Sequence, residues 1–139
     1  MRISQRQVGD VVVLDLVGPL AGWKAAGLVK ETVRRLGRAG THTVVANLAR
    51  VRSMDLAGLG ALVDGYSTMR EGGGEMRLAS LTRRIHDLVV IARLLTVFNT
   101  FDSVEQAIEG PSPAYAGIAE PAQRSPMAVG MIHRFLRRA

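Results

Sequence analysis

The fold is decided by residues 44–62, VVANLARVRSMDLAGLGAL. This stretch opens with β-branched and other apolar residues without polar alternation, the pattern of a central strand that helices cover on both faces. We therefore predict a buried strand over 43–48. Asp55 is the expected N-cap of the helix that follows. The buried side of this helix should carry Leu59, Leu62, Val63, Tyr66 and Met69.

The remaining part of residues 1–110 continues the alternation of strands and helices. Strands are expected over 2–8, 11–17, 75–80 and 98–101, and helices over 23–38, 82–95 and a short segment capped by Asp102 or Ser103. The helix over 23–38 should bury Ala25, Leu28, Val29, Thr32 and Leu36. Glycines mark where the first two helices end, at 37–40 and 72–74. This pattern predicts an α/β fold with a mixed central sheet of four to five strands and about four helices.

Three segments make up the predicted domain organisation. Residues 1–110 form one domain, 111–125 have the Pro, Ala, Gly and Ser composition of a flexible linker, and 126–139 read as a basic amphipathic C-terminal helix or tail. The apolar stripe of the tail favours packing on its own domain or on a second subunit over contact with a membrane surface. Neither an apolar leader nor a membrane-spanning stretch is apparent, so we expect a cytoplasmic protein.

The net charge of +6 is divided between body and tail. Residues 1–110 carry 14 basic and 11 acidic side chains, whereas 111–139 carry 4 basic and 1 acidic. Aromatic residues make up only 4% of the chain, which leaves few platforms for stacking bases. A nearly balanced body and scarce aromatics argue against nucleic-acid binding.

Residues that carry chemistry are sparse and scattered. Cysteine is absent, which excludes thiolate metal sites and cysteine nucleophiles. His42, His86 and His133 have no second ligand type at metal-binding spacing. The acidic residues form no local pair, and the glycine run 72–74 follows a helix, unlike a phosphate-binding loop. We expect a protein that is not an enzyme and needs neither a metal nor a cofactor.

The candidate functional site is the turn and first helical residues after the buried strand. Its residues are Ser53, Met54, Asp55, Leu56, Ala57, Gly58 and Gly60. One interpretation is structural: Gly58 and Gly60 let the helix pack closely on the sheet. The other is functional: the amides and positive dipole of the helix N-terminus attract a partner. On the functional interpretation, Gly58→Arg should leave the fold largely intact and abolish partner binding.

Residues 44–62 resemble the signature of the STAS domain family, named for sulfate transporters and anti-sigma-factor antagonists. The resemblance also covers Gly18, the passage 72–78 and the segment 98–108, so it extends over roughly residues 5–110. In this family a buried strand leads to a Met-Asp-Ser-Ser-Gly-Leu-Gly-like turn and helix. Met54, Asp55, Gly58 and Gly60 match that pattern directly. The resemblance implies a STAS fold.

In phosphorylatable members of the family, this turn docks on an anti-sigma factor with serine-kinase activity. The kinase phosphorylates the second serine and thereby expels the antagonist. That serine corresponds to Ala57, its companion to Leu56, and the acidic residue at the strand end to Asn47. Alanine has no hydroxyl, so we expect no phosphorylation in the switch turn. Ser53 is the nearest hydroxyl, but it lies four residues upstream.

The resemblance implies a protein-binding function. We favour an anti-sigma-factor antagonist-like regulatory module whose partner is an anti-sigma factor or serine-kinase-like ATPase. The alternative is a STAS subunit of a larger assembly, such as a stressosome-like scaffold or the cytosolic partner of a lipid transporter. The sequence leaves open whether the chain forms a homodimer.

Overall fold

The computed structural model describes residues 1–110. The elements follow the chain as β1 (Arg2–Val8), β2 (Val11–Val17), α1 (Gly22–Arg38), β3 (Thr43–Arg50), α2 (Leu56–Glu71), β4 (Glu75–Ala79), α3 (Arg83–Ile91), β5 (Asn99–Phe101) and α4 (Val104–Glu109). The predicted α/β fold is therefore confirmed, with five strands and four helices in the described range. The expected linker over 111–125 and the expected tail over 126–139 lie outside the described residues.

The five strands form one sheet in the order β1-β2-β3-β4-β5. The N-terminal hairpin pairs β1 with β2 in antiparallel register, from Arg2 opposite Val17 to Val8 opposite Val11. The other neighbouring pairs are parallel. The sheet is thus mixed, as predicted, and the carboxyl ends of its four parallel strands lie at the same edge.

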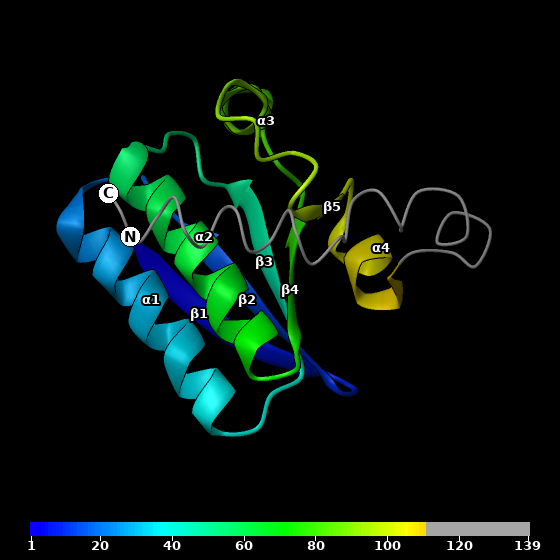
Figure 1. The fold of residues 1–139 in the computed structure, drawn as a ribbon. Helices are drawn as coiled ribbons and strands as arrows, with labels where there is room; N and C mark the ends of the chain where they lie inside the picture. The colour runs from blue at the N-terminus through cyan, green and yellow to red at the C-terminus, as the bar shows by residue number, and fades with distance from the viewer. Residues whose placement is uncertain (111–139) are drawn as a thin grey trace.

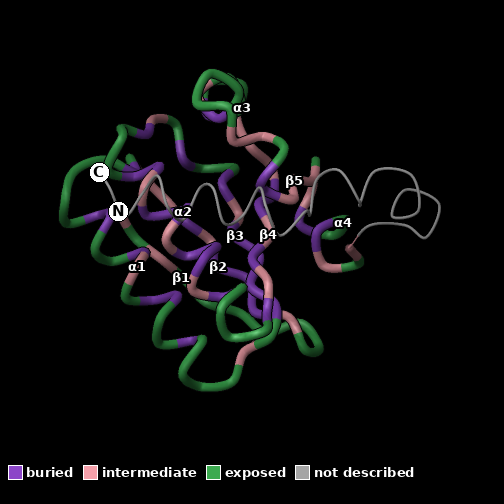
Figure 2. The backbone as a smooth tube through the Cα atoms, in the orientation of Figure 1, coloured by how far each residue is buried: buried purple, intermediate pink, exposed green. Residues whose placement is uncertain are grey.

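Helices cover the sheet unequally, as Figure 1 shows. Helices α1 and α2 lie side by side on one face, called here the front face, and α4 lies on the back face. Successive residues of a strand point to opposite faces, and the two apolar clusters follow this rule. In β3, Val44, Ala46 and Leu48 belong to the large front cluster, whereas Val45 belongs to the small back cluster. Buried residues therefore concentrate in β2, β3 and β4 and on the inner sides of the helices (Figure 2).

Three helices end in the same hydrogen-bond pattern, although only two of them end at glycine. Gly40 and Gly73 have φ angles of +87° and +83°, and the amides that follow them bond back to Leu36 and Met69. At the end of α3, Arg93 takes the place of the glycine and adopts a φ of +61°. The Leu94 amide bonds to Val89 at 3.0 Å, which closes α3 at Ile91. The expected extension of this helix to residue 95 is therefore wrong.

The buried side of α1 differs from the expected stripe at three positions. Leu28 is 42% exposed, and the buried positions are Ala25, Ala26, Val29, Thr32, Val33 and Leu36. Helix α1 packs against both the sheet and α2, so its buried sector is wide enough to include Ala26 and Val33. Leu28 falls just outside that sector.

Candidate functional site

The candidate site lies where two connections meet at the carboxyl edge of the parallel strands. One connection joins β2 to α1 and the other joins β3 to α2. Backbone hydrogen bonds hold them together: Leu20 N–H donates to the Ser53 carbonyl at 3.0 Å, and Asp55 N–H donates to the Leu20 carbonyl at 3.3 Å. A further bond runs from the Gly18 amide to the Arg50 carbonyl at 3.2 Å. The Leu20 side chain is fully buried, so the two loops form one fixed unit.

Asp55 links the N-termini of α1 and α2. Its Oδ1 accepts from the Gly58 amide at 2.9 Å, which confirms the predicted N-cap of α2. Its Oδ2 accepts from the Gly22 amide at 2.8 Å, and Gly22 is the first residue of α1. These two hydrogen bonds hold the pKa of the Asp55 carboxyl below its ordinary value, and the bond from the Gly58 amide has the larger effect. One ionised side chain therefore caps α2 and fixes the start of α1 beside it.

The structure separates the predicted site residues into exposed and buried groups. Asp55, Leu56 and Ala57 are exposed, and the Leu56 side chain is 84% accessible. Ser53 and Gly60 are partly exposed, whereas Met54 and Gly58 are buried. The surface that a partner can reach on this turn is therefore centred on Leu56 and Ala57.

Gly58 packs against the backbone of the neighbouring connection. A Cβ atom built on Gly58 would lie 2.0 Å from the Leu20 carbonyl oxygen, far inside any permitted contact. The expectation that Gly58→Arg leaves the fold intact is therefore wrong, because even a methyl group has no space there. A Cβ on Gly60 would meet nothing within 4 Å. The structural interpretation thus holds for Gly58 and does not explain Gly60.

Trp23 is an exposed aromatic residue beside this turn that the sequence analysis missed. It is 79% exposed at the beginning of α1, and the Lys24 ammonium lies 5.6 Å from the centre of its ring. Trp23 follows Gly22, and Leu56 follows Asp55, so both apolar residues adjoin the Gly22–Asp55 hydrogen bond. A tryptophan outside the apolar stripe of its helix was the signal available in the sequence. We call Trp23, Leu56 and Ala57 the apolar rim.

A polar cluster occupies the back face behind the site. Asp15 accepts from Arg6 Nε at 2.8 Å and from Asn47 Nδ2 at 2.7 Å. Partial burial raises the pKa of Asp15, but these hydrogen bonds and the charges of Arg6 and Arg50 outweigh it and hold the pKa below its ordinary value. Asn47 thus acts as a donor to an acidic residue, at the position where the STAS resemblance places an acidic side chain.

Two further properties concern the described range alone. Within residues 1–110, no group of three or more His, Cys, Asp or Glu side chains is placed to hold a metal ion. None of the helices in this range is both long enough and apolar enough to cross a membrane.

Comparison with known proteins identifies the family. The sequence model described as the STAS domain matches residues 2–107. This chain belongs to the STAS family. The STAS match includes both connections at the carboxyl edge and the capped start of α2, so the apolar rim is part of the family domain.

Solved structures share the STAS fold at low sequence identity. A putative anti-sigma factor antagonist from Thermotoga maritima is 22% identical, with a TM-score of 0.68 over 77% of this chain and 92% of that one. The phosphorylated form of the Bacillus cell fate determinant SpoIIAA is 18% identical, with a TM-score of 0.63 over 78% and 97%. Murine solute carrier 26 family member A9, an anion transporter, is 18% identical, with a TM-score of 0.62 over 75% of this chain but 18% of the transporter. The same fold therefore occurs in stand-alone proteins and within a larger membrane protein.

Proposed function

We propose that this STAS protein is an anti-sigma-factor antagonist-like regulatory module that binds a protein partner through the apolar rim and has no catalytic role. The observation that carries the proposal is the exposure of Leu56 and Trp23 on either side of a rigid, hydrogen-bonded turn. Exposed apolar residues grouped at one place are typical of protein interfaces, and tryptophan is enriched among residues that dominate binding energy. The partner class is an anti-sigma factor of the serine-kinase-like ATPase type, in the cytoplasm of a bacterium.

Preorganisation supports binding at this turn. Asp55 bonds to the first residue of α1 and to the third residue of α2, and Leu20 bonds to both sides of the β3–α2 connection. A surface already held in one conformation loses little entropy when it binds. The rim can therefore dock with little rearrangement.

The missing hydroxyl at position 57 determines how this module is regulated. A phosphoryl group would add about −1.5 to −2 charge and bulk at a contact made by a small side chain. Ala57 is exposed and cannot carry that group. We propose that the module stays binding-competent, so partner switching depends on the abundance of the protein or on other ligands.

The test uses paired variants of exposed apolar residues. Leu56→Asp changes the rim, and Ile91→Asp is the matched control because Ile91 is 79% exposed on α3, away from the turn. Proteins retained from native cells by the unmodified chain are identified by mass spectrometry, purified and titrated by calorimetry. Leu56→Asp should lower affinity at least about tenfold, whereas Ile91→Asp should leave it unchanged. A partner that binds both variants equally well would place the interface elsewhere.

The second candidate is a STAS subunit of a larger assembly, such as a stressosome-like scaffold or the cytosolic partner of a lipid transporter. The similarity to the fold of a domain within an anion transporter favours it. Light scattering of the purified chain at increasing concentration distinguishes the two candidates in part. A homodimer or higher oligomer that survives dilution supports the assembly, whereas a monomer with a one-to-one ATPase partner supports the antagonist.

A further inference from the structure

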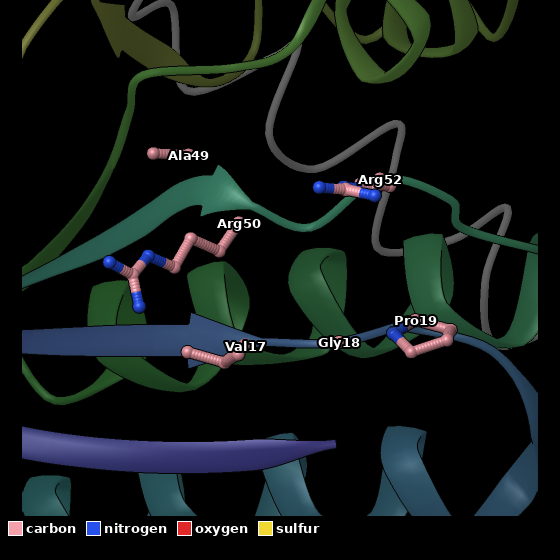
Figure 3. A pocket seen from close by; sticks show the side chains of 6 residues that line it. All are labelled: Val17, Gly18, Pro19, Ala49, Arg50 and Arg52. Atoms are coloured by element: carbon pink, nitrogen blue, oxygen red, sulfur yellow. The ribbon is translucent and has the colours of Figure 1, made fainter.

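A pocket opens on the back face at the ends of β2 and β3, separate from the apolar rim. It has a volume of about 470 Å³, within the roughly 300–1,000 Å³ range of small-molecule sites. Its lining residues are Val17, Gly18, Pro19, Ala49, Arg50 and Arg52. Figure 3 shows the pocket between the end of β2, which supplies Val17 to Pro19, and the end of β3, which supplies Ala49 to Arg52.

Two arginines that form no ion-pair contact within residues 1–110 border this pocket. Across residues 1–110, neither Arg50 nor Arg52 forms an ion pair, and neither guanidinium makes a side-chain hydrogen bond. In Figure 3 the two guanidinium groups lie at different ends of the pocket, Arg50 over the strands and Arg52 toward the connection to α2. A guanidinium offers paired donors that match the oxygens of a carboxylate or phosphate. Both guanidinium groups can therefore donate hydrogen bonds to such a ligand.

The neighbouring charges reinforce a positive potential over the pocket. Arg2 lies opposite Val17 in the antiparallel pair, so its side chain projects on the same face of the sheet. The acidic groups on this side of the sheet include Asp15, with which Arg6 pairs at 2.8 Å, and Glu105, which interacts with Arg6 through its charge. The described pocket lining contains two arginines and no acidic residue, and Arg2 adds positive charge on the same face. A concave surface lined by one sign of charge concentrates ions of the opposite sign.

The remaining walls are apolar. Val17, Pro19 and Ala49 present hydrocarbon to the pocket between the two arginines. An inorganic ion would leave these walls exposed to water, whereas an organic ligand would cover them and gain from their burial. The arrangement therefore favours a ligand with both an anionic group and an apolar body.

We infer that this pocket binds a small organic anion, a carboxylate or a phosphate ester with a compact apolar body. The anionic group pairs with the guanidinium of Arg52 or Arg50, and the apolar body covers Val17, Pro19 and Ala49. This inference does not depend on the proposed partner, because the pocket lies on the back face and the apolar rim lies at the start of α1 and α2.

The test is a titration of the full chain, followed through its backbone amide resonances. The probes are 1-naphthoate for a carboxylate, 1-naphthyl phosphate for a phosphate ester, and inorganic phosphate as the anion without an apolar body. At least one naphthyl probe should bind at least about tenfold more tightly than inorganic phosphate, with shifts concentrated at residues 17–19 and 49–52. Comparison of the two naphthyl probes decides which anionic group the pocket prefers.

Variants that replace each pocket arginine by neutral glutamine test whether these residues contribute to the affinity. Arg52→Gln and Arg50→Gln together should weaken the preferred naphthyl probe by about tenfold or more, because each removes a charged hydrogen-bond donor. Arg84→Gln is the matched control, since Arg84 is exposed on α3 and does not line the pocket. Amide spectra of the unliganded variants verify that the fold is retained. Three results would each overturn the inference. They are chemical-shift changes scattered over all arginines, an affinity for inorganic phosphate equal to that for the naphthyl probes, and an undiminished affinity of the double variant for the preferred probe.

Discussion

Replacing Gly58 by alanine tests the packing that fixes the candidate site. The added Cβ would lie 2.0 Å from the Leu20 carbonyl oxygen and 2.9 Å from Leu20 Cγ, so the helix start or Leu20 must move by roughly 1 Å. Overpacking of this kind costs about 1–3 kcal/mol. Displacing Leu20 also weakens its hydrogen bonds to Ser53 and Asp55, worth about 1 kcal/mol each. The higher helix propensity of alanine offsets about 1 kcal/mol, so the net loss should be about 2–4 kcal/mol if both hydrogen bonds are lost.

Gly60→Ala is the matched control in the same helix. Its Cβ would meet nothing within 4 Å, so helix propensity alone should act and raise stability by about 0.5–1 kcal/mol. Urea denaturation followed by circular dichroism measures both variants against the unmodified chain. The two substitutions should shift the midpoint in opposite directions. A Gly58→Ala midpoint equal to or above that of Gly60→Ala would refute the close contact between α2 and Leu20.

Three other predictions concern charge and modification. Arg77 donates to the Ala107 carbonyl at 2.7 Å and so anchors α4. Arg77→Gln should therefore cost about 2 kcal/mol and speed amide exchange in α4, whereas Arg35→Gln, at an exposed position of α1, should do neither. The pKa of Asp55 is lowered by folding, so its contribution to stability is present above the unfolded-state pKa of about 3.9 and is lost as pH falls through the folded-state pKa. Urea midpoints from about pH 5 to about pH 2 should therefore decline less for Asp55→Asn than for the unmodified chain. Intact-mass spectrometry of protein from its own cells should show no adduct of about 80 Da, and such an adduct on Ser53 would restore a phosphorylation switch.

The elements that sequence patterns predicted well are those with a local cause. The run 43–48 is mostly apolar because β3 is covered on both faces, and Asp55 precedes the helix that it caps. Glycines at 40 and 73 adopt the positive φ that ends α1 and α2. The end of α3 was misplaced because a non-glycine residue, Arg93, takes the same conformation there. Nothing in the local sequence distinguishes that arginine from one inside a helix.

Features of the site that depend on contacts between distant segments could not be predicted. Leu20, which lies 38 positions earlier in the chain, leaves no space for a side chain at Gly58. The second hydrogen bond of Asp55, to Gly22, spans 33 positions. Trp23 adjoins the turn because that bond and the backbone bonds of Leu20 join the two connections. The family resemblance pointed to the turn as the candidate site, but the exposed surface on it became apparent only from the packing of two connections.

Hydrogen exchange of the chain, free and saturated with its purified partner, tests the binding role most directly. Backbone amides report local opening, so a docked partner slows exchange where it covers the surface. We expect slower exchange at residues 22–24 and 53–60, centred on the apolar rim, with α3 unchanged. Protection confined to α3 or to the strands of the sheet, with residues 53–60 exchanging as in the free chain, would contradict binding through the apolar rim.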